Sequence, residues 1–315
     1  MAPGLLPERI EALLAPDSLR LRRNGGSETV AVTANGDEAW RAPLAALDHA
    51  LRTRPARAAP GAARLPPALA AMLAPRLDIV LSEHFVRWQL LPWQSDVEAP
   101  AEQEAWARHN FREVYGDISR HWRVRCADQP PGAATPACAI DDALLLALRQ
   151  LVEVHGCRLG SLRPLFAAAA GRWQRKLPRG IAWFAVLESD RLSLGLLCER
   201  RWRALHGEPV AASEQSGELL AGLITRSAIA AGIAPGEGRL LLCGEGADTC
   251  PVPLPTDAVQ RLGSALPWTA AAREARRIAC APDAGPPQGR RSQTTEPRSG
   301  EPPSPPALGR GLGEG

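Results

Sequence analysis

The sequence has a single lysine, no C-x-x-C pair and no apolar run long enough to cross a bilayer. Lys176 is the only lysine, and the 37 basic residues are nearly balanced by 34 acidic ones, which leaves a net charge of +3. A nucleic-acid-binding protein is typically far more basic. The longest stretch without a charged residue covers only residues 129–140 and is rich in proline. We therefore expect neither a nucleic-acid partner nor a membrane span.

Metal and disulfide sites also lack their usual sequence patterns. The seven cysteines are odd in number and widely spaced, which argues against a zinc site and against a disulfide framework. The six histidines show no H-x-x-H or H-E-x-x-H spacing. The first residues lack the basic and apolar regions of a signal peptide. These absences indicate a cytoplasmic protein without a resident metal.

Hydrophobic residues make up 45% of the chain, enough for a folded core. Residues 281–315 contain eight prolines and seven glycines, and we expect them to form a disordered tail. Within this tail, Pro302 to Pro306 has P-x-x-P spacing, which could dock on an aromatic groove. Residues 54–75, rich in Ala, Pro and Arg, are interpreted as an insertion with a loop or a short helix.

The remaining sequence alternates between strand and helix patterns. A hairpin is predicted around the turn Asn24-Gly25-Gly26. The predicted strands cover residues 18–23, 29–33, 77–81, 85–91, 122–126, 137–140, 158–163, 181–188, 191–198, 201–205 and 239–243. The predicted helices cover 43–54, 101–115, 141–154, 164–174, 214–230 and 256–262, with Asp141 as an N-cap. The order predicts a mixed α/β protein made of two similar units.

Three passages resemble the PilM/GspL/MshI family of actin-like proteins from type IV pilus and type II secretion assembly platforms. They are the double strand that ends in Leu-Pro before Trp93, the meander 181–205, and the strand that leads into the glycine loop 244–247. The resemblance covers about residues 15–270. It implies a two-lobed, ribonuclease-H-like ATPase-type fold with mixed sheets. The expected lobes are 1–163 and 164–280.

In such a fold, a hairpin turn of each lobe carries a carboxylate for Mg²⁺ or a nucleophilic water, and backbone amides for phosphates. The first predicted turn, Asn24 to Gly26, has no preceding aspartate. The second offers Glu188 and Asp190 but lacks a glycine. Both turns are interpreted as ordinary hairpins, although the resemblance leaves weak binding of ATP with magnesium open.

The candidate adenosine loop contains Gly244, Gly246 and Ala247 after a buried strand. Its two glycines would let the backbone approach a base or a phosphate. A tight strand-to-helix turn explains the same residues equally well, so both interpretations stay open. The candidate partner-binding residues are Trp88 and Trp93, because tryptophan is enriched at interface hot spots.

The resemblance implies a degenerate actin-like scaffold, without ATP turnover, on the cytoplasmic side of an assembly platform. Its expected partners are inner-membrane PilN- or GspM-like proteins, which would place it at the inner membrane indirectly, or an assembly ATPase. One alternative is an active actin-like phosphotransferase that uses Glu188 or Asp190. Another is an α/β interaction domain without nucleotide that acts through its proline-rich tail.

Overall fold

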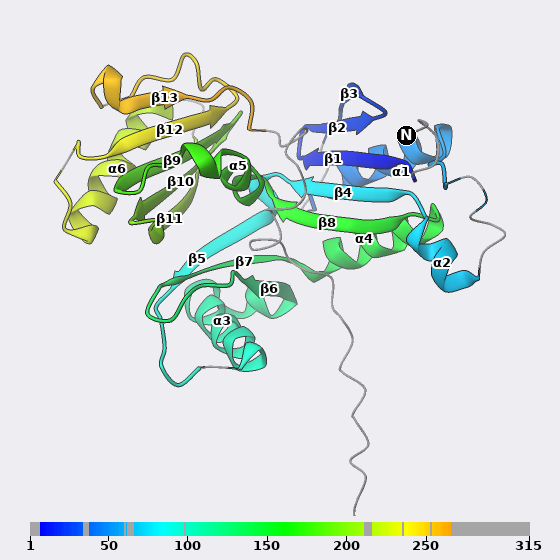
Figure 1. Cartoon of the computed structure of the whole chain (residues 1–315), viewed down its shortest axis with the longest axis horizontal. Helices are drawn as coiled ribbons and strands as arrows, with labels where there is room; N and C mark the ends of the chain where they lie inside the picture. The colour runs from blue at the N-terminus through cyan, green and yellow to red at the C-terminus, as the bar shows by residue number, and fades with distance from the viewer. Residues whose placement is uncertain are drawn as a thin grey trace, which may run out of the picture. The chain divides into compact units, whose positions relative to one another are not determined.

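A computed structural model describes residues 7–33, 38–59, 61, 66–97, 99–210, 216–234, 236–252 and 254–265. The tail expected at 281–315 lies outside the described residues. The described residues form three β-sheets with helices packed against them (Figure 1). Their helices are all too short or too polar to span a bilayer.

The first sheet has the strand order β3-β2-β1-β4-β8. Its strands are β1 (Arg9–Ala15), β2 (Ser18–Arg23), β3 (Gly26–Ala31), β4 (Arg76–Leu81) and β8 (Arg158–Pro164). β1 is antiparallel to β2 and parallel to β4, and β8 continues in parallel. Helices α1 (Arg41–Thr53) and α4 (Asp142–Val154) bury their leucines against one core with this sheet.

The second sheet, β11-β10-β9-β12-β13, repeats the order and the directions of the first. Its strands are β9 (Ile181–Glu188), β10 (Arg191–Cys198), β11 (Arg201–Pro209), β12 (Arg239–Gly244) and β13 (Val259–Arg261). As in the first sheet, two antiparallel pairings are followed by two parallel ones. Helix α6 (Ser216–Ala231) shares a core with this sheet. The two five-stranded sheets therefore share one topology although their sequences differ.

Helix α5 (Leu165–Trp173) lies between the two five-stranded sheets. One core joins its alanines to Leu13 and Val80 of the first sheet and to Phe184 and Val186 of the second. Small side chains at 167–170 allow the two sheets to approach the helix closely. At its end, the Arg172 guanidinium and the Lys176 ammonium lie 4.7 and 4.8 Å from the centre of the Trp173 ring.

The third sheet, β5-β7-β6, is antiparallel. It contains β5 (Val86–Leu91), β6 (Trp122–Cys126) and β7 (Thr135–Asp141), and it shares a small core with α3 (Pro100–Tyr115). Short 3-10 helices at Glu83–Phe85 (η2) and Gly116–His121 (η3) lead into β5 and β6. As predicted, Asp141 caps α4: its carboxylate accepts the Ala143 N–H at 2.8 Å.

Most predicted elements are confirmed, and four strands agree with their predicted bounds: 18–23, 122–126, 181–188 and 191–198. The predictions for the two edge strands β13 and β3 were wrong in part, and one central strand, β1, was missed. The helix expected at 256–262 is the 3-10 turn Thr256–Ala258 followed by β13. Strand β1 was not predicted, and β3 begins at Gly26 rather than at residue 29. The insertion 54–75 contains the short helix α2 (Pro67–Met72). The lobe boundary at 163/164 stays a prediction.

Candidate functional site

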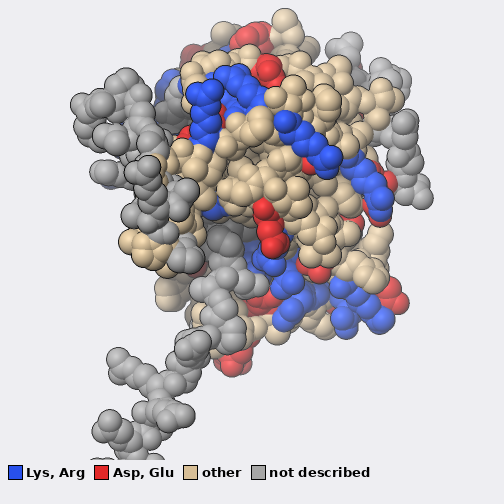
Figure 2. Space-filling model, turned by 90° about the vertical axis from the view of Figure 1, so that its right-hand side faces the viewer, with Lys and Arg blue, Asp and Glu red and all other residues tan. Residues whose placement is uncertain are grey.

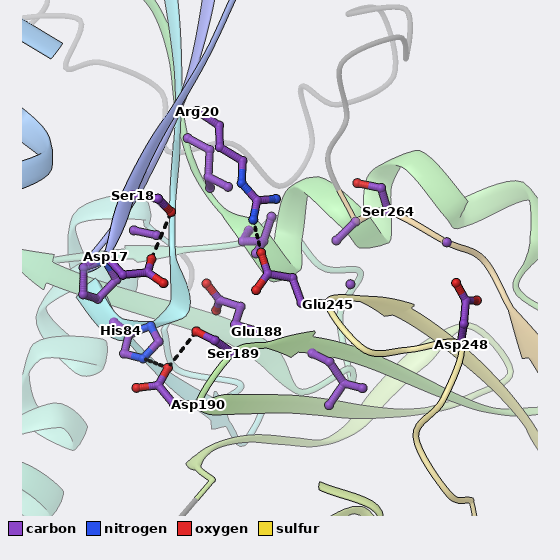
Figure 3. A pocket seen from close by; sticks show the side chains of 18 residues that line it. Asp17, Ser18, Arg20, His84, Glu188, Ser189, Asp190, Glu245, Asp248 and Ser264 are labelled. Carbon is purple, nitrogen blue, oxygen red and sulfur yellow. Dashed lines mark hydrogen bonds and ion pairs between the residues drawn. The ribbon is translucent and has the colours of Figure 1, made fainter. Parts of the chain in front are cut away.

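A cavity of about 330 Å³ lies between the first and second sheets (Figure 3). Its walls are the β1–β2 turn, η2, the start of α5, the β9–β10 turn and the loops after β12 and β13. The turn at the cavity is therefore Pro16-Asp17, not the predicted Asn24 to Gly26. The predicted hairpin at Asn24 to Gly26 is present between β2 and β3, but it does not line the cavity, because β1 precedes β2 and the first hairpin turn comes one hairpin earlier in the chain.

The charged side chains that line the cavity are mainly acidic. Five carboxylates face two basic groups there, and both basic groups are engaged. Arg20 pairs with Glu245 across the cavity, and His84 Nε2 lies 2.7 Å from Asp190 Oδ1. The lining acids are Asp17, Glu188, Asp190, Glu245 and Asp248. The cavity thus has an excess of negative charge.

Glu188 is held by the end of β4. The Ser82 hydroxyl donates to Glu188 Oε1 at 2.5 Å, and the Glu83 N–H donates to Oε2 at 3.0 Å. Burial raises the pKa of Glu188 above its usual range, although both hydrogen bonds act in the opposite direction. Glu188 therefore links the second sheet to the first.

Glu83, whose backbone N–H donates to Glu188, has a buried side chain. Its carboxyl group accepts the Phe166 N–H and the Trp88 indole N–H, each at 2.6 Å. Burial, with a smaller contribution from nearby Glu188, raises the pKa of Glu83 to about 8. Two carboxyl groups in one buried place favour a state in which they share a proton.

Ser82, His84 and Asp190 stand in the order of a catalytic triad. Ser82 Oγ lies 2.7 Å from His84 Nδ1, and His84 Nε2 reaches Asp190. However, Ser82 is completely buried and its hydroxyl donates to Glu188. A nucleophile must be accessible to its substrate, so these residues form a structural chain of hydrogen bonds. No sequence signal marks Ser82 or His84, since only the fold brings β4 to the β9–β10 turn.

The glycine loop after β12 is fastened to its neighbours. The Gly244 N–H donates to the Gly263 carbonyl and the Glu245 N–H to the Leu187 carbonyl, each at 2.9 Å. Gly244 has φ +108, and a Cβ there would lie 2.1 Å from the Leu187 carbonyl oxygen. A glycine is thus required by backbone packing alone.

The cavity brings together only part of the predicted site. Glu188, Asp190 and Gly244 line it, whereas Gly246 does not, and Ala247 is buried in the core behind it. Of the two tryptophans, Trp88 points inward to Glu83 and Phe166, and Trp93 is 48% exposed. The roles of these residues in nucleotide and partner binding stay predictions.

No protein-family model and no curated protein sequence matches the chain. A chain of the PilM–PilN type IV pilus biogenesis complex is similar in structure, with a TM-score of 0.50 and 14% identity, over 86% of this chain and 94% of that one. The cytoplasmic domain of EpsL, an inner membrane component of the type II secretion system of Vibrio cholerae, has a TM-score of 0.46 and 12% identity, over 83% and 91%. A Bacteroides thetaiotaomicron protein with an actin-like ATPase fold and unknown function has a TM-score of 0.48 and 10% identity, over 78% and 84%.

The repeated sheet topology, with the likeness to the chain from the PilM–PilN complex, decides the fold. The chain has the actin-like fold. The expectation of a two-unit α/β protein with mixed sheets is confirmed. The cavity between the sheets is the place where this fold implies a nucleotide with Mg²⁺.

The residues present do not fit a magnesium–nucleotide complex. Pro16 has no N–H to offer a phosphate, and the turn that contains it has no glycine. The two carboxylates predicted to hold Mg²⁺, Glu188 and Asp190, are engaged with Ser82, Glu83 and His84, and Asp17 of the β1–β2 turn accepts the Ser18 hydroxyl. Among the described residues, no three His, Cys, Asp or Glu side chains form a group that could hold a metal. The excess of carboxylates would also repel a triphosphate.

Proposed function

We propose that the chain is a non-catalytic actin-like adaptor of a type IV pilus or type II secretion assembly platform. The observation that carries the proposal is that the β1–β2 turn contains Pro16, which has no N–H for a phosphate, and that the carboxylates at the β9–β10 turn are engaged with Ser82, Glu83 and His84. A site of this kind favours a permanent bridge between the sheets over a cycle of nucleotide binding and release.

The place in an assembly platform is supported by the likeness to a chain of the PilM–PilN type IV pilus biogenesis complex. Under the proposal, the partner is a PilN- or GspM-like inner-membrane protein, which presents a short cytoplasmic segment, or an assembly ATPase. Trp93, the more exposed of the two candidate tryptophans, is the anchor we expect at such an interface. The protein would then work on the cytoplasmic side, at the inner membrane through its partner.

The charged surface is compatible with protein partners. On the face in Figure 2, groups of basic side chains each have acidic side chains beside them. Mixed charge of this kind gives specificity through local complementarity, whereas a nucleic-acid partner favours a continuous basic surface.

A calorimetric titration of the full chain with Mg²⁺-ATP and with ADP tests the nucleotide half of the proposal. We expect no binding at millimolar nucleotide. Micromolar binding that is lost on Gly246→Trp would overturn this half and restore a working adenosine loop. ATP turnover that falls on Glu188→Gln or Asp190→Asn would favour the phosphotransferase instead.

Cross-linked co-purification from the native cell, followed by reconstitution with the identified partner, tests the adaptor half. We expect a pilus or secretion inner-membrane protein or assembly ATPase, and weaker binding of its cytoplasmic segment by Trp93→Ala. Val154→Ala, which changes another exposed apolar residue at the end of α4, is the matched control. Recovery of no such partner, or equal binding by both variants, contradicts the interface as proposed.

A further inference from the structure

A second, smaller cavity of about 190 Å³ lies where β5 and the end of α3 meet β10 and β11. It is lined by the side chains of Arg87 and Arg191, together with Tyr115, Gly207 and Glu208. Its volume admits a few water-sized groups and is far too small for a nucleotide. It is separate from the larger cavity, and Glu83 belongs to its wall while Glu188 belongs to the other.

The two arginines of this cavity have no acidic partner among the described residues. Arg87 Nη1 donates only to the His84 and Val86 carbonyls, at 3.0 and 2.9 Å, and Arg191 Nη2 donates to the Gly207 carbonyl at 3.1 Å. Most half-buried arginines in the described part of the chain differ, as Arg76 and Arg125 do, because they form ion pairs with carboxylates. Two half-buried cations that lie side by side and form no ion pair are costly in a folded protein.

Two hydrogen-bond donors beside the cavity are buried and unsatisfied. Arg191 Nε has no partner, and neither does the hydroxyl of Ser193, which is only 2% exposed. Residues two apart on a strand share a face, so both donors lie on one side of β10. A Cβ added at Gly207 would lie 3.6 Å from Arg191 Nη2 and 3.9 Å from Ser193 Oγ, so both side chains lie beside the same glycine. Each buried unsatisfied donor destabilises the fold unless something binds it.

The charge of the cavity is positive. Arg87 and Arg191 repel each other, and burial together with Arg191 lowers the pKa of Arg87. Against them stand Glu208 and Glu83, and Glu83 is largely protonated near neutral pH because its pKa is raised to about 8. Glu208 alone does not neutralise two guanidinium groups.

We propose that this cavity binds a small oxyanion, a phosphate or a carboxylate group, between Arg87 and Arg191. Planar guanidinium groups match the oxygens of both anions, and a bound anion would supply the ion pair that Arg87 and Arg191 do not form with a carboxylate of the described residues. The inference does not depend on the proposed function. Titrating the larger cavity with nucleotide does not test it.

The test is a calorimetric titration of the full chain with inorganic phosphate and, separately, with acetate, at constant ionic strength set with chloride. We expect saturable binding of at least one of them. Arg87→Gln and Arg191→Gln each remove a charged hydrogen-bond donor and are expected to weaken binding about tenfold or more. Arg203→Gln, an exposed arginine on β11, is the matched control and keeps wild-type affinity.

Binding of phosphate but not acetate would identify a phosphate or phosphoryl group as the natural occupant, and the reverse would identify a carboxylate such as a peptide side chain. Absence of saturable binding of both anions to the wild-type chain overturns the proposal, whether or not the variants fold. If Arg203→Gln weakened anion binding as much as the other two substitutions, the proposal would also be overturned, because the loss would then follow from the net charge of the protein.

Discussion

Ser82 at the end of β4 and Glu188 at the end of β9 are joined by a hydrogen bond of 2.5 Å between hydroxyl and carboxylate. The two residues belong to different five-stranded sheets and are far apart in sequence. Glu188 is half-buried at the end of β9, and this bond and the one from the Glu83 N–H join the two sheets where Glu188 lines the larger cavity.

Removing the Ser82 hydroxyl is expected to destabilise the chain. Ser82→Ala leaves the buried carboxyl group of Glu188 with one donor fewer, at a cost of about 1–3 kcal/mol. The measurement is urea unfolding at neutral pH. Ser189→Ala, in the exposed turn next to Glu188, is the control and should change the free energy of unfolding by less than about 0.5 kcal/mol. Equal effects of the two substitutions would contradict the bridging role.

The stability of the chain should fall as pH rises because of Glu83. Its pKa is about 8 in the folded state against an ordinary value of 4.5, so its contribution is fully present below 4.5 and is lost as pH rises toward 8. Thermal unfolding of wild type and Glu83→Gln between pH 5 and pH 8 measures this. We expect a shallower fall in the variant, and parallel curves would show that Glu83 ionises in the folded state as it does in the unfolded one.

The opposite pH dependence is expected from Glu8. Its carboxylate accepts hydrogen bonds from Arg23 Nε and Nη2, at 3.1 and 3.0 Å, and from the Arg57 N–H at 2.8 Å. Although burial acts to raise it, the pKa of Glu8 is lowered by Arg23 and the Arg57 amide. The resulting stability is present above pH 4.5 and is lost as pH falls through the lowered folded value.

The pair formed by Glu8 and Arg23 also predicts a strong effect of mutation. Glu8→Ala leaves the guanidinium of Arg23 buried without its counter-ion and should cost about 3–5 kcal/mol in urea unfolding. The exposed pair of Arg120 and Asp117 is the comparison, and Asp117→Ala should cost at most about 1 kcal/mol. Similar losses of unfolding free energy in Glu8→Ala and Asp117→Ala would show that burial does not strengthen the pair of Glu8 and Arg23.

Two glycines of one loop should respond differently to the same substitution. Gly244→Ala forces a Cβ against the Leu187 carbonyl at a backbone conformation that alanine avoids, so we expect a loss well above 2 kcal/mol. Gly246→Ala, with φ +71 and open space around it, should cost only about 1–2 kcal/mol. Comparing their urea midpoints tests this, and a reversed order would show that the loop relaxes at Gly244.

The sequence predicts the strands around the second turn well because regular alternation and short turns mark them, as at Ile181 to Cys198. Strand β1 escaped prediction because Arg9–Ala15 ends in a continuous apolar run instead of a regular alternation and is closed by Pro16. With β1 missing, the turn at Asp17 could not be recognised as part of the site.

The predicted site residues that line the cavity, Glu188, Asp190 and Gly244, all stand at strand ends. Ser82 follows β4 and His84 lies in η2. Their part in the site depends on Glu188 and Asp190, about a hundred residues later in the chain. No local pattern contains such a partnership. The same holds for Arg87 and Arg191, whose shared cavity exists only after β5 lies beside β11.

The position of Lys176 beside the Trp173 ring has a practical consequence for mapping partners. An amine-directed cross-linker or dye can attach to only one side chain of this protein, since Lys176 is its only lysine. Any cross-link from a side-chain amine to a partner therefore reports a distance from the end of α5, and a dye attached there reports on an indole in direct contact. The chain thus contains a natural single-site probe.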